Sequence, residues 1–210
     1  MLKEYHSSTV GEVGIDEAGR GCLFGPVCIG AVVMKPEGFS NPPYEIKDSK
    51  KLSAQKRKIL RGYIERHSLA YSVAMIHPEV IDQINILQAT MKGMHECLDD
   101  LCQRTPISHI LVDGTYFTIY TDKDSFEAIP HDCIQGGDNK YQSIAAASIL
   151  AKEYRDEYIQ QVVSQNPELQ GYGIHTNKGY GTKIHINALY ESGITEWHRK
   201  SFEPCKSLLK

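Results

Sequence analysis

The sequence has little that points away from an ordinary folded domain. Its six cysteines include no Cys-x-x-Cys pair, which argues against zinc and against a disulfide framework, so we expect reduced cysteines that serve mainly in packing. The longest apolar runs, at residues 27–34 and 144–151, are far too short to cross a bilayer. The first residues also lack the apolar segment of a signal peptide. We therefore expect no membrane association and a cytoplasmic location.

The chain also lacks a surplus of positive charge, since its net charge is -3. The distribution is nevertheless uneven, because residues 47–61 carry seven lysines and arginines against the single acid Asp48. Such a cluster can bind a phosphate backbone whatever the total charge, and a solvated helix surface has the same pattern. The cluster supports a polyanionic partner without proving one.

Hydrophobic periodicity predicts interleaved strands and helices, without internal repeats, low-complexity tracts or long linkers. We expect strands at residues 12–16, 27–34, 69–76, 109–114 and 129–134. We expect helices after the N-cap Ser53 to residue 67, from Pro78 to about 98, around 144–152 and over 182–191. In the first helix Ile59, Leu60, Tyr63 and Ile64 are expected to form the apolar face. The interleaving predicts an α/β sheet with helices on its faces.

Residues 14–21, Gly-Ile-Asp-Glu-Ala-Gly-Arg-Gly, form the most informative stretch. Asp16 and Glu17 leave a short apolar segment and enter a glycine-rich turn. Glycine lets backbone N–H groups approach a ligand closely, and carboxylates hold hard cations, so the stretch predicts a binding or catalytic centre. Taken alone, such an Asp-Glu pair is more typical of a charged hairpin turn, because strand ends are often polar.

Two further aspartates follow predicted strands, namely Asp113 beside Gly114 and Asp138 after a glycine pair. Ligands bind at the carboxyl ends of strands in such sheets, so we expect Asp16, Asp113 and Asp138 at one edge. Grouped carboxylates repel one another unless cations neutralise them, and the absence of a convergent Cys/His set favours magnesium or manganese over zinc. Two such ions can activate water and stabilise a leaving oxygen, which predicts phosphodiester hydrolysis. Pattern alone does not separate Asp138 from three other acids, Asp122, Asp124 and Asp132.

Ordered blocks over nearly the whole chain resemble those of the bacterial type 2 ribonucleases H, ribonuclease HII. Each block is weak by itself, whereas the ordered set is specific. The blocks are residues 14–21 with Gly25-Pro26, 48–52, 85–90, 112–114, 137–138, 144–152 with Arg155-Asp156, 179–182 with His185, and 198–202.

The resemblance implies an RNase H-like fold with a five-stranded mixed sheet flanked by helices. It implies a catalytic domain over residues 1–170, continuous with a helical C-terminal part over 171–210 that clamps the substrate. It also implies an enzyme that hydrolyses RNA in RNA/DNA hybrids and incises 5′ of single ribonucleotides in duplex DNA. We expect this enzyme to be a monomer. The expected products carry 3′-hydroxyl and 5′-phosphate ends.

The resemblance also assigns residues. The four metal-binding carboxylates, which hold two Mg²⁺ or Mn²⁺ ions, correspond to Asp16, Glu17, Asp113 and Asp138, and Asp16 is expected to bridge both ions. The segment that reads the ribonucleotide through backbone contacts corresponds to Gly19, Arg20 and Gly21, and the tyrosine that packs on the sugar corresponds to Tyr180. The blocks that contact phosphates contain Lys50, Ser148, Lys152 and Arg155. Lys152 and Arg155 are alternatively exposed helix charges.

The sequence departs from the family at Gly136, where a basic residue is usual, so one phosphate contact is expected to be weaker or supplied elsewhere. His175, His185 and His198 are candidates for proton shuttles, and structural hydrogen bonding or exposure is the alternative. Two rival functions remain. Ribonuclease HIII shares the carboxylates but carries an additional N-terminal domain and lacks Gly-Arg-Gly. An inactive nucleic-acid-binding module would have lost part of the carboxylate set.

Overall fold

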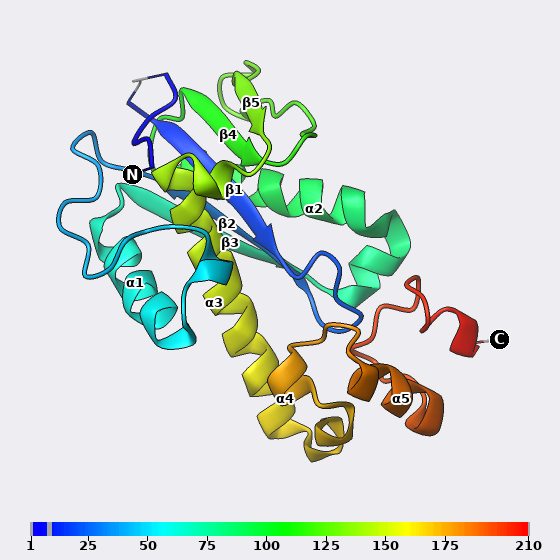
Figure 1. Ribbon diagram of the computed structural model, residues 1–210. Coiled ribbons are helices and arrows are strands. Elements are labelled where there is room, and N and C mark those ends of the chain that lie inside the picture. Colours follow the sequence, from blue (N-terminus) through cyan, green and yellow to red (C-terminus); the bar gives the residue numbers. More distant parts are fainter. Residues whose placement is uncertain (1, 8–9, 210) are drawn as a thin grey trace.

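A mixed five-stranded sheet organises the computed structural model, which describes residues 2–7 and 10–209 (Figure 1). The strand order is β3-β2-β1-β4-β5. Neighbours are antiparallel within β3-β2-β1 and parallel within β1-β4-β5. The predicted fold class, a five-stranded mixed sheet flanked by helices, is confirmed. The strands are β1 (Glu12–Ala18), β2 (Val27–Val33), β3 (Ala70–Ile76), β4 (His109–Asp113) and β5 (His131–Ile134).

Helices cover both faces of this sheet, with α2 on one face and α1 and α3 on the other (Figure 1). None of the helices in the described part of the chain is long and apolar enough to span a membrane. The helices are α1 (Ala54–His67), α2 (Pro78–Cys102), α3 (Gln142–Gln165), α4 (Ile174–Asn177) and α5 (Lys183–Ser192). Short 3-10 turns occupy Ser49–Lys51, Gly137–Asn139, Pro167–Tyr172 and Ser207–Leu209.

Helix α3 lies directly on the central strands β1 and β2. A Cβ atom at Gly30 of β2 would lie 2.4 Å from the carbonyl oxygen of Ala147 and 3.1 Å from the amide nitrogen of Ala151. The close approach therefore requires glycine on the strand and small residues, such as Ala147 and Ala151, on the helix. All seven residues of β2 are buried, because helices cover both of its faces.

Helix α1 begins as predicted, with the Ser53 hydroxyl accepting a hydrogen bond from the Lys56 amide at 3.4 Å. Leu60 and Ile64 are buried, but Ile59 is exposed, so its predicted place on the apolar face is wrong. In a helix, Ile59 is rotated about 100° from Leu60, beyond the edge of the buried stripe.

Helix α2 is interrupted at Asn85, whose φ of 65° and ψ of 165° are not helical. The Asn85 side chain accepts hydrogen bonds from the amides of Leu87 and Gln88, at 3.0 and 3.1 Å. It therefore acts as an N-cap that restarts the helix. The prediction of one uninterrupted helix was wrong, because the apolar spacing continues across the break.

The C-terminal part packs around the far end of α3. Its buried side chains, including Leu189 and Cys205, share one apolar cluster with Leu23, Phe24 and Ile159. The described residues of this C-terminal part thus pack against the remainder of the fold. All six cysteines are free thiols, as expected.

Candidate active site

The predicted carboxylates lie at one edge of the sheet. Strands β1 and β4 run parallel with Ile15 opposite Val112, so the next residues, Asp16 and Asp113, end side by side. Strand β1 continues past its predicted end to Ala18, which places Glu17 within the strand. Asp138 lies in the 3-10 turn that leads from β5 into α3.

A backbone or side-chain donor orients each aspartate. The Glu17 amide donates to Asp16 Oδ1 at 2.7 Å, and the Gly137 amide donates to Asp113 Oδ1 at 2.7 Å. The Asn139 side chain donates to Asp138 Oδ1 at 2.8 Å. The hydrogen bond from Gly137 to Asp113 joins the Asp138 turn to the end of β4, so the fold itself brings Asp113 and Asp138 together.

Burial and mutual repulsion disfavour the charged forms of these groups. Burial raises the pKa of Asp16 well above its usual range, and the neighbouring charges of Glu17 and Asp113 raise it further. Burial also raises the pKa of Glu17, although Arg20 opposes the shift across a 3.5 Å ion pair. The pKa of Asp138 is raised by burial, then by Asp48 and Asp113. Such a carboxylate cluster gains stability from a cation.

Lys50 faces this acidic cluster. Burial disfavours its charged ammonium, yet its pKa is raised because nearby carboxylates outweigh burial. Asp48, which is buried and caps the Ser49–Lys51 turn by accepting from the Lys50 amide at 2.9 Å, is one of them. The sequence prediction did not assign Asp48 to the site, and its block at residues 48–52 was the available signal. The carboxylates that raise the pKa of Lys50 are those of Asp48, Asp16, Asp138 and Asp113.

The donor set suits hard divalent ions, because carboxylate oxygens are the ligands that Mg²⁺ and Mn²⁺ prefer. Within residues 2–7 and 10–209, however, no three acidic, histidine or cysteine side chains already surround one point closely enough to hold an ion. The four carboxylates are neighbours without forming a closed cage. Their roles as metal ligands stay a prediction.

The Gly-Arg-Gly segment forms a tight turn directly after β1. Gly19 has φ of +84°, which favours glycine, and its carbonyl accepts from the Cys22 amide at 3.2 Å. Arg20 and Gly21 are exposed. The turn therefore presents accessible backbone beside Glu17.

Tyr180 lies next to this turn. The Leu23 amide donates to the Gly179 carbonyl at 2.9 Å, which ties the two loops together. Tyr180 is 44% exposed, and Lys152 Nζ lies 5.9 Å from the centroid of the Tyr180 ring. The Lys152 ammonium is also paired with Asp156 at 2.7 Å. Tyr180 and Lys152 thus share one surface beside the Gly-Arg-Gly turn.

Two predicted phosphate contacts are buried. Arg155 is fully buried and donates to the carbonyls of Pro26, Phe24 and Lys178 at 2.8 to 2.9 Å. Both readings of Arg155, as a phosphate ligand and as an exposed charge, are therefore wrong, since its guanidinium is already used inside the fold. The Ser148 hydroxyl lies 2.9 Å from the Ser49 hydroxyl and also bonds Asp16. The bond to Asp16 partly offsets the rise in the pKa of that carboxyl.

The basic cluster at residues 47–61 is partly neutralised. Arg57 Nε lies 2.7 Å from Glu153 of α3, and Arg61 lies 2.7 Å from both Glu65 and Glu157. The arginines thus join α1 to α3 instead of facing solvent unpaired. Among the described residues, four lysines of the cluster have no carboxylate within 4.0 Å. They are Lys50, Lys51, Lys56 and Lys58.

The histidines have structural positions. His185 and His198 are buried, with their Nε2 atoms 3.0 Å apart. The Thr195 amide donates to His198 Nδ1 at 2.9 Å, so His198 donates from Nε2 and His185 donates from Nδ1 to the Tyr180 carbonyl at 3.0 Å. His175 is exposed. The structural reading of His185 and His198 is confirmed.

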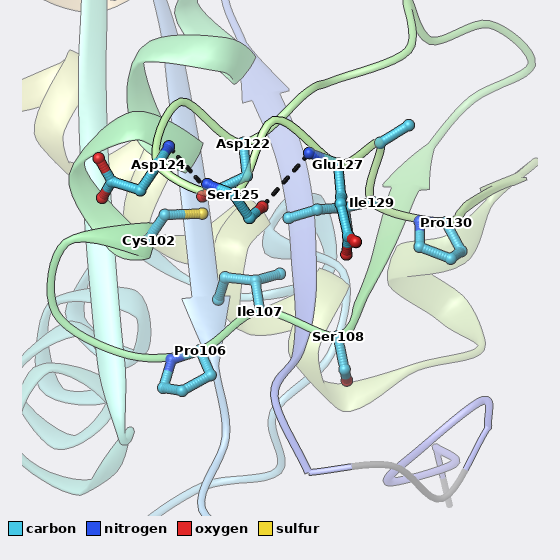
Figure 2. Close-up of a pocket in the computed structure, with 11 residues that line it drawn as sticks. Cys102, Pro106, Ile107, Ser108, Asp122, Asp124, Ser125, Glu127, Ile129 and Pro130 are labelled. Atoms are coloured by element: carbon cyan, nitrogen blue, oxygen red, sulfur yellow. Dashed lines mark hydrogen bonds between the residues drawn. The ribbon is translucent and has the colours of Figure 1, made fainter.

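The acids that competed with Asp138 lie elsewhere. Asp122 and Asp124 belong to the loop between β4 and β5, where they line a cavity of about 470 Å³ with Cys102 (Figure 2). Asp132 is the second residue of β5 and pairs with His109 at 2.8 Å. None of the three is among the main causes of the raised pKa of Asp16 or Glu17.

Comparison with known proteins identifies the family. The model of the ribonuclease HII family matches residues 13–205. The chain belongs to the ribonuclease HII family. A ribonuclease HII from Parabacteroides distasonis is 46% identical over 202 residues, which cover 96% of this chain and 94% of that protein. The ribonuclease HII of Christiangramia forsetii is 43% identical over 209 residues, or 100% of this chain and 98% of the relative.

Solved structures show the same fold. Ribonuclease H2 from Pyrococcus horikoshii superposes with a TM-score of 0.71 at 23% identity, covering 94% of this chain and 96% of that one. Bst-RNase HIII, solved in complex with Mn²⁺, superposes with a TM-score of 0.72 at 19% identity. The match covers 94% of this chain and 68% of that one. Membership of the ribonuclease HII family makes the chain a hydrolase of the ribonuclease H type, which acts on RNA/DNA hybrids and depends on divalent metal. The family prediction is confirmed, and the ribonuclease HIII and inactive-module alternatives are set aside.

Proposed function

We propose that this ribonuclease HII family member also incises duplex DNA on the 5′ side of a single embedded ribonucleotide. The observation that carries the proposal is that the acids of β1 and the Gly19–Gly21 turn follow each other directly along the chain. Asp16 and Glu17 end at the carboxylate cluster, and the Gly19–Gly21 turn follows within two residues. A group bound on that turn lies next to the acids.

We propose that Asp16, Glu17, Asp113 and Asp138 hold two Mg²⁺ or Mn²⁺ ions. Bound ions of this kind activate water and stabilise the leaving oxygen of a phosphodiester. The raised pKa values of Asp16 and Asp138 support this role, because they reflect crowded negative charge that a cation relieves. Asp16 adjoins both Glu17 and Asp113, which supports its proposed position between the ions.

The neighbouring residues would orient the substrate. Arg20 pairs with Glu17 at 3.5 Å and keeps that carboxylate in place, while Lys50 supplies positive charge opposite the acids. Lys152 and the Ser148 hydroxyl border the same region, and their contacts to phosphates remain part of the proposal. The 3′-hydroxyl and 5′-phosphate ends follow if water attacks the phosphorus on the 5′ side of the ribonucleotide and the 3′-oxygen of the preceding nucleotide leaves.

Recognition of a single ribonucleotide requires reading its 2′-hydroxyl, the group that distinguishes it from DNA. We propose that the backbone of Gly19, Arg20 and Gly21 binds this hydroxyl and the adjacent phosphate, with Tyr180 packing on the sugar. Support comes from the accessible Arg20–Gly21 backbone and from the half-exposed Tyr180 ring beside it. Residues 171–210 would clamp the duplex, and the active form is expected to be a cytoplasmic monomer.

The test is cleavage of a labelled duplex that contains one ribonucleotide, with Mg²⁺ or Mn²⁺ supplied separately. A nick on the 5′ side of the ribonucleotide, with a 3′-hydroxyl end that a polymerase extends, is expected. The same duplex without the ribonucleotide must stay intact. Cleavage of a long RNA/DNA hybrid but not of this duplex, in either metal, would refute the proposal while leaving the family activity in place.

A further inference from the structure

Arg199 lies in the 198–202 block, to which the proposed function gives no role. Its side chain is fully buried, and all three guanidinium nitrogens bond the loop after β1. Nη2 donates to the Gly19 carbonyl at 2.8 Å, Nη1 to the Arg20 carbonyl at 2.8 Å, and Nε to the Gly25 carbonyl at 3.0 Å. One residue near the C-terminus thus fixes three carbonyls of the N-terminal turn.

These bonds determine where the neighbouring amides point. In a trans peptide the C=O and N–H bonds are directed oppositely. Because the carbonyls of Gly19 and Arg20 point inward to Arg199, the N–H groups of Arg20 and Gly21 point outward. Within the described chain neither N–H group has an acceptor, and both residues are exposed. The turn therefore offers two free donors on its outer side.

The charge beneath the turn is also unusual. Arg199 and Arg155 are both fully buried, and within residues 2–7 and 10–209 no carboxylate lies within 4.0 Å of either. Burial and the charge of Arg155 lower the pKa of Arg199 to about 10, which leaves it charged at neutral pH. Burying a cation without a counterion is costly, so the bonded carbonyls must compensate. The remaining positive field lies under the outward donors and favours an anionic ligand.

We propose that Arg199 is a positioning residue for ribonucleotide recognition, which holds the Gly19 and Arg20 carbonyls inward so that the Arg20 and Gly21 amides face the substrate. Arg199 itself does not touch the nucleic acid. The inference rests on the proposed function for its ligand, whereas the positioning of the turn concerns the free protein and is measured without substrate.

The decisive variant is Arg199→Lys, which keeps the charge but cannot reach three separate carbonyls. Hydrogen exchange of the Cys22 amide, which donates to Gly19, reports the state of the turn. Exchange should accelerate at least about tenfold beyond any change in global stability, the scale of a lost hydrogen bond. Leu101→Ala is the matched control, because it weakens the core on α2 without touching the turn. Unchanged protection of Cys22 in Arg199→Lys overturns the proposal.

The second measurement is binding, without divalent metal so that no cleavage occurs, to a duplex with one ribonucleotide and to the same duplex in all-DNA form. Arg199→Lys should reduce the affinity ratio between the two by about tenfold relative to wild type, and Leu101→Ala should leave the ratio unchanged. A retained preference despite a loosened turn overturns the recognition role. A wild-type protein without any preference refutes the proposed reading of the ribonucleotide by the Gly19–Gly21 turn, and the exchange result then still decides the positioning. If Arg199→Lys does not fold, Arg199→Gln, which keeps a planar donor, takes its place.

Discussion

At the scale of single residues, Asp16 combines the strongest electrostatic strain with the most central position in the site. It is only 5% exposed, and burial together with Glu17 and Asp113 disfavours its charge. A carboxylate kept in such a place weakens the fold, which is the pattern of a residue retained for chemistry. Removal of its charge should therefore separate activity from stability.

We expect Asp16→Asn to lower cleavage by at least roughly 10²-fold, since it removes an electrostatic stabiliser of the reaction. Its melting temperature should stay equal to or exceed that of wild type, because the repulsion from Glu17 and Asp113 disappears. Thermal melting and single-turnover cleavage measure the two effects. Asp124→Asn, on the loop between β4 and β5, is the control and should change neither. A large drop in melting temperature would contradict the electrostatic argument.

His198 makes the stability of the fold depend on pH. Burial, followed by the proximity of His185, lowers its pKa from 6.5 to about 3. Between about pH 6.5 and 3, His198 is therefore protonated in the unfolded chain and neutral in the folded chain. The free energy of unfolding consequently falls as the pH falls through that window. At pH 5 the loss from His198 is roughly 2 kcal/mol. Urea unfolding at pH 7.5 and 5 measures it, and His198→Gln should reduce the difference by about that amount. An identical pH dependence in both proteins would refute the assignment.

At the scale of secondary structure, the contact between β2 and α3 sets the position of the site. Helix α3 follows the Asp138 turn and carries Ser148, so a displaced helix moves two parts of the carboxylate region. Within this contact, Gly30 does not tolerate a larger side chain, because a Cβ atom there would meet backbone atoms of Ala147 and Ala151.

Gly30→Ala should lower the free energy of unfolding by about 1–3 kcal/mol, the scale of overpacking, because backbone atoms of α3 cannot move aside locally. Gly171→Ala is the matched control, since a Cβ atom there meets nothing within 4 Å. Urea unfolding of both variants measures the difference. Equal stability of the two would show that α3 shifts without penalty.

The same elements show how far sequence can predict this structure. The end of β4 at Asp113 was predictable, because a buried apolar run stops there at an acid-glycine pair, whereas β1 continues two residues past its predicted end at Asp16. The break at Asn85 was not, since a left-handed residue leaves the apolar spacing of the helix unchanged. The burial of Arg155 was not predictable either, because its three carbonyl partners lie 23 to 131 residues away in the chain. Long-range backbone acceptors leave no local pattern in a sequence.

At the scale of the whole molecule, a net charge of -3 coexists with binding of a polyanion. In the cluster at residues 47–61, Lys51, Lys56 and Lys58 have no carboxylate within 4.0 Å among the described residues, whereas Arg57 and Arg61 hold α1 against α3. The predicted basic cluster therefore divides into lysines that remain available to a ligand and arginines that are already paired within the fold, a division that depends on acids of α3 and could not be predicted from α1 alone.

Salt titration of binding should reveal this division. Each lysine that contacts a phosphate contributes about one unit to the slope of log K against log salt. The double substitution of Lys51 and Lys58 with Ala should thus reduce the slope by about 1–2. Arg61→Gln should leave it unchanged, since Arg61 is already paired with Glu65 and Glu157. Fluorescence anisotropy of a labelled hybrid measures these slopes, and a larger effect of Arg61→Gln would reverse the assignment.

The bond between Arg199 and the Gly19 carbonyl spans 180 residues, and it bears on how the protein is made. At a synthesis rate of about 5–20 residues per second, the turn at Gly19 waits roughly 10–40 s for its partner. During that time the strands and carboxylates can already assemble, but the turn lacks the guanidinium that fixes it. The proposed recognition turn is therefore completed only after residue 199 has been synthesised, and a nascent chain truncated before residue 199 carries the acids of the site without the guanidinium that fixes the Gly19–Gly21 turn.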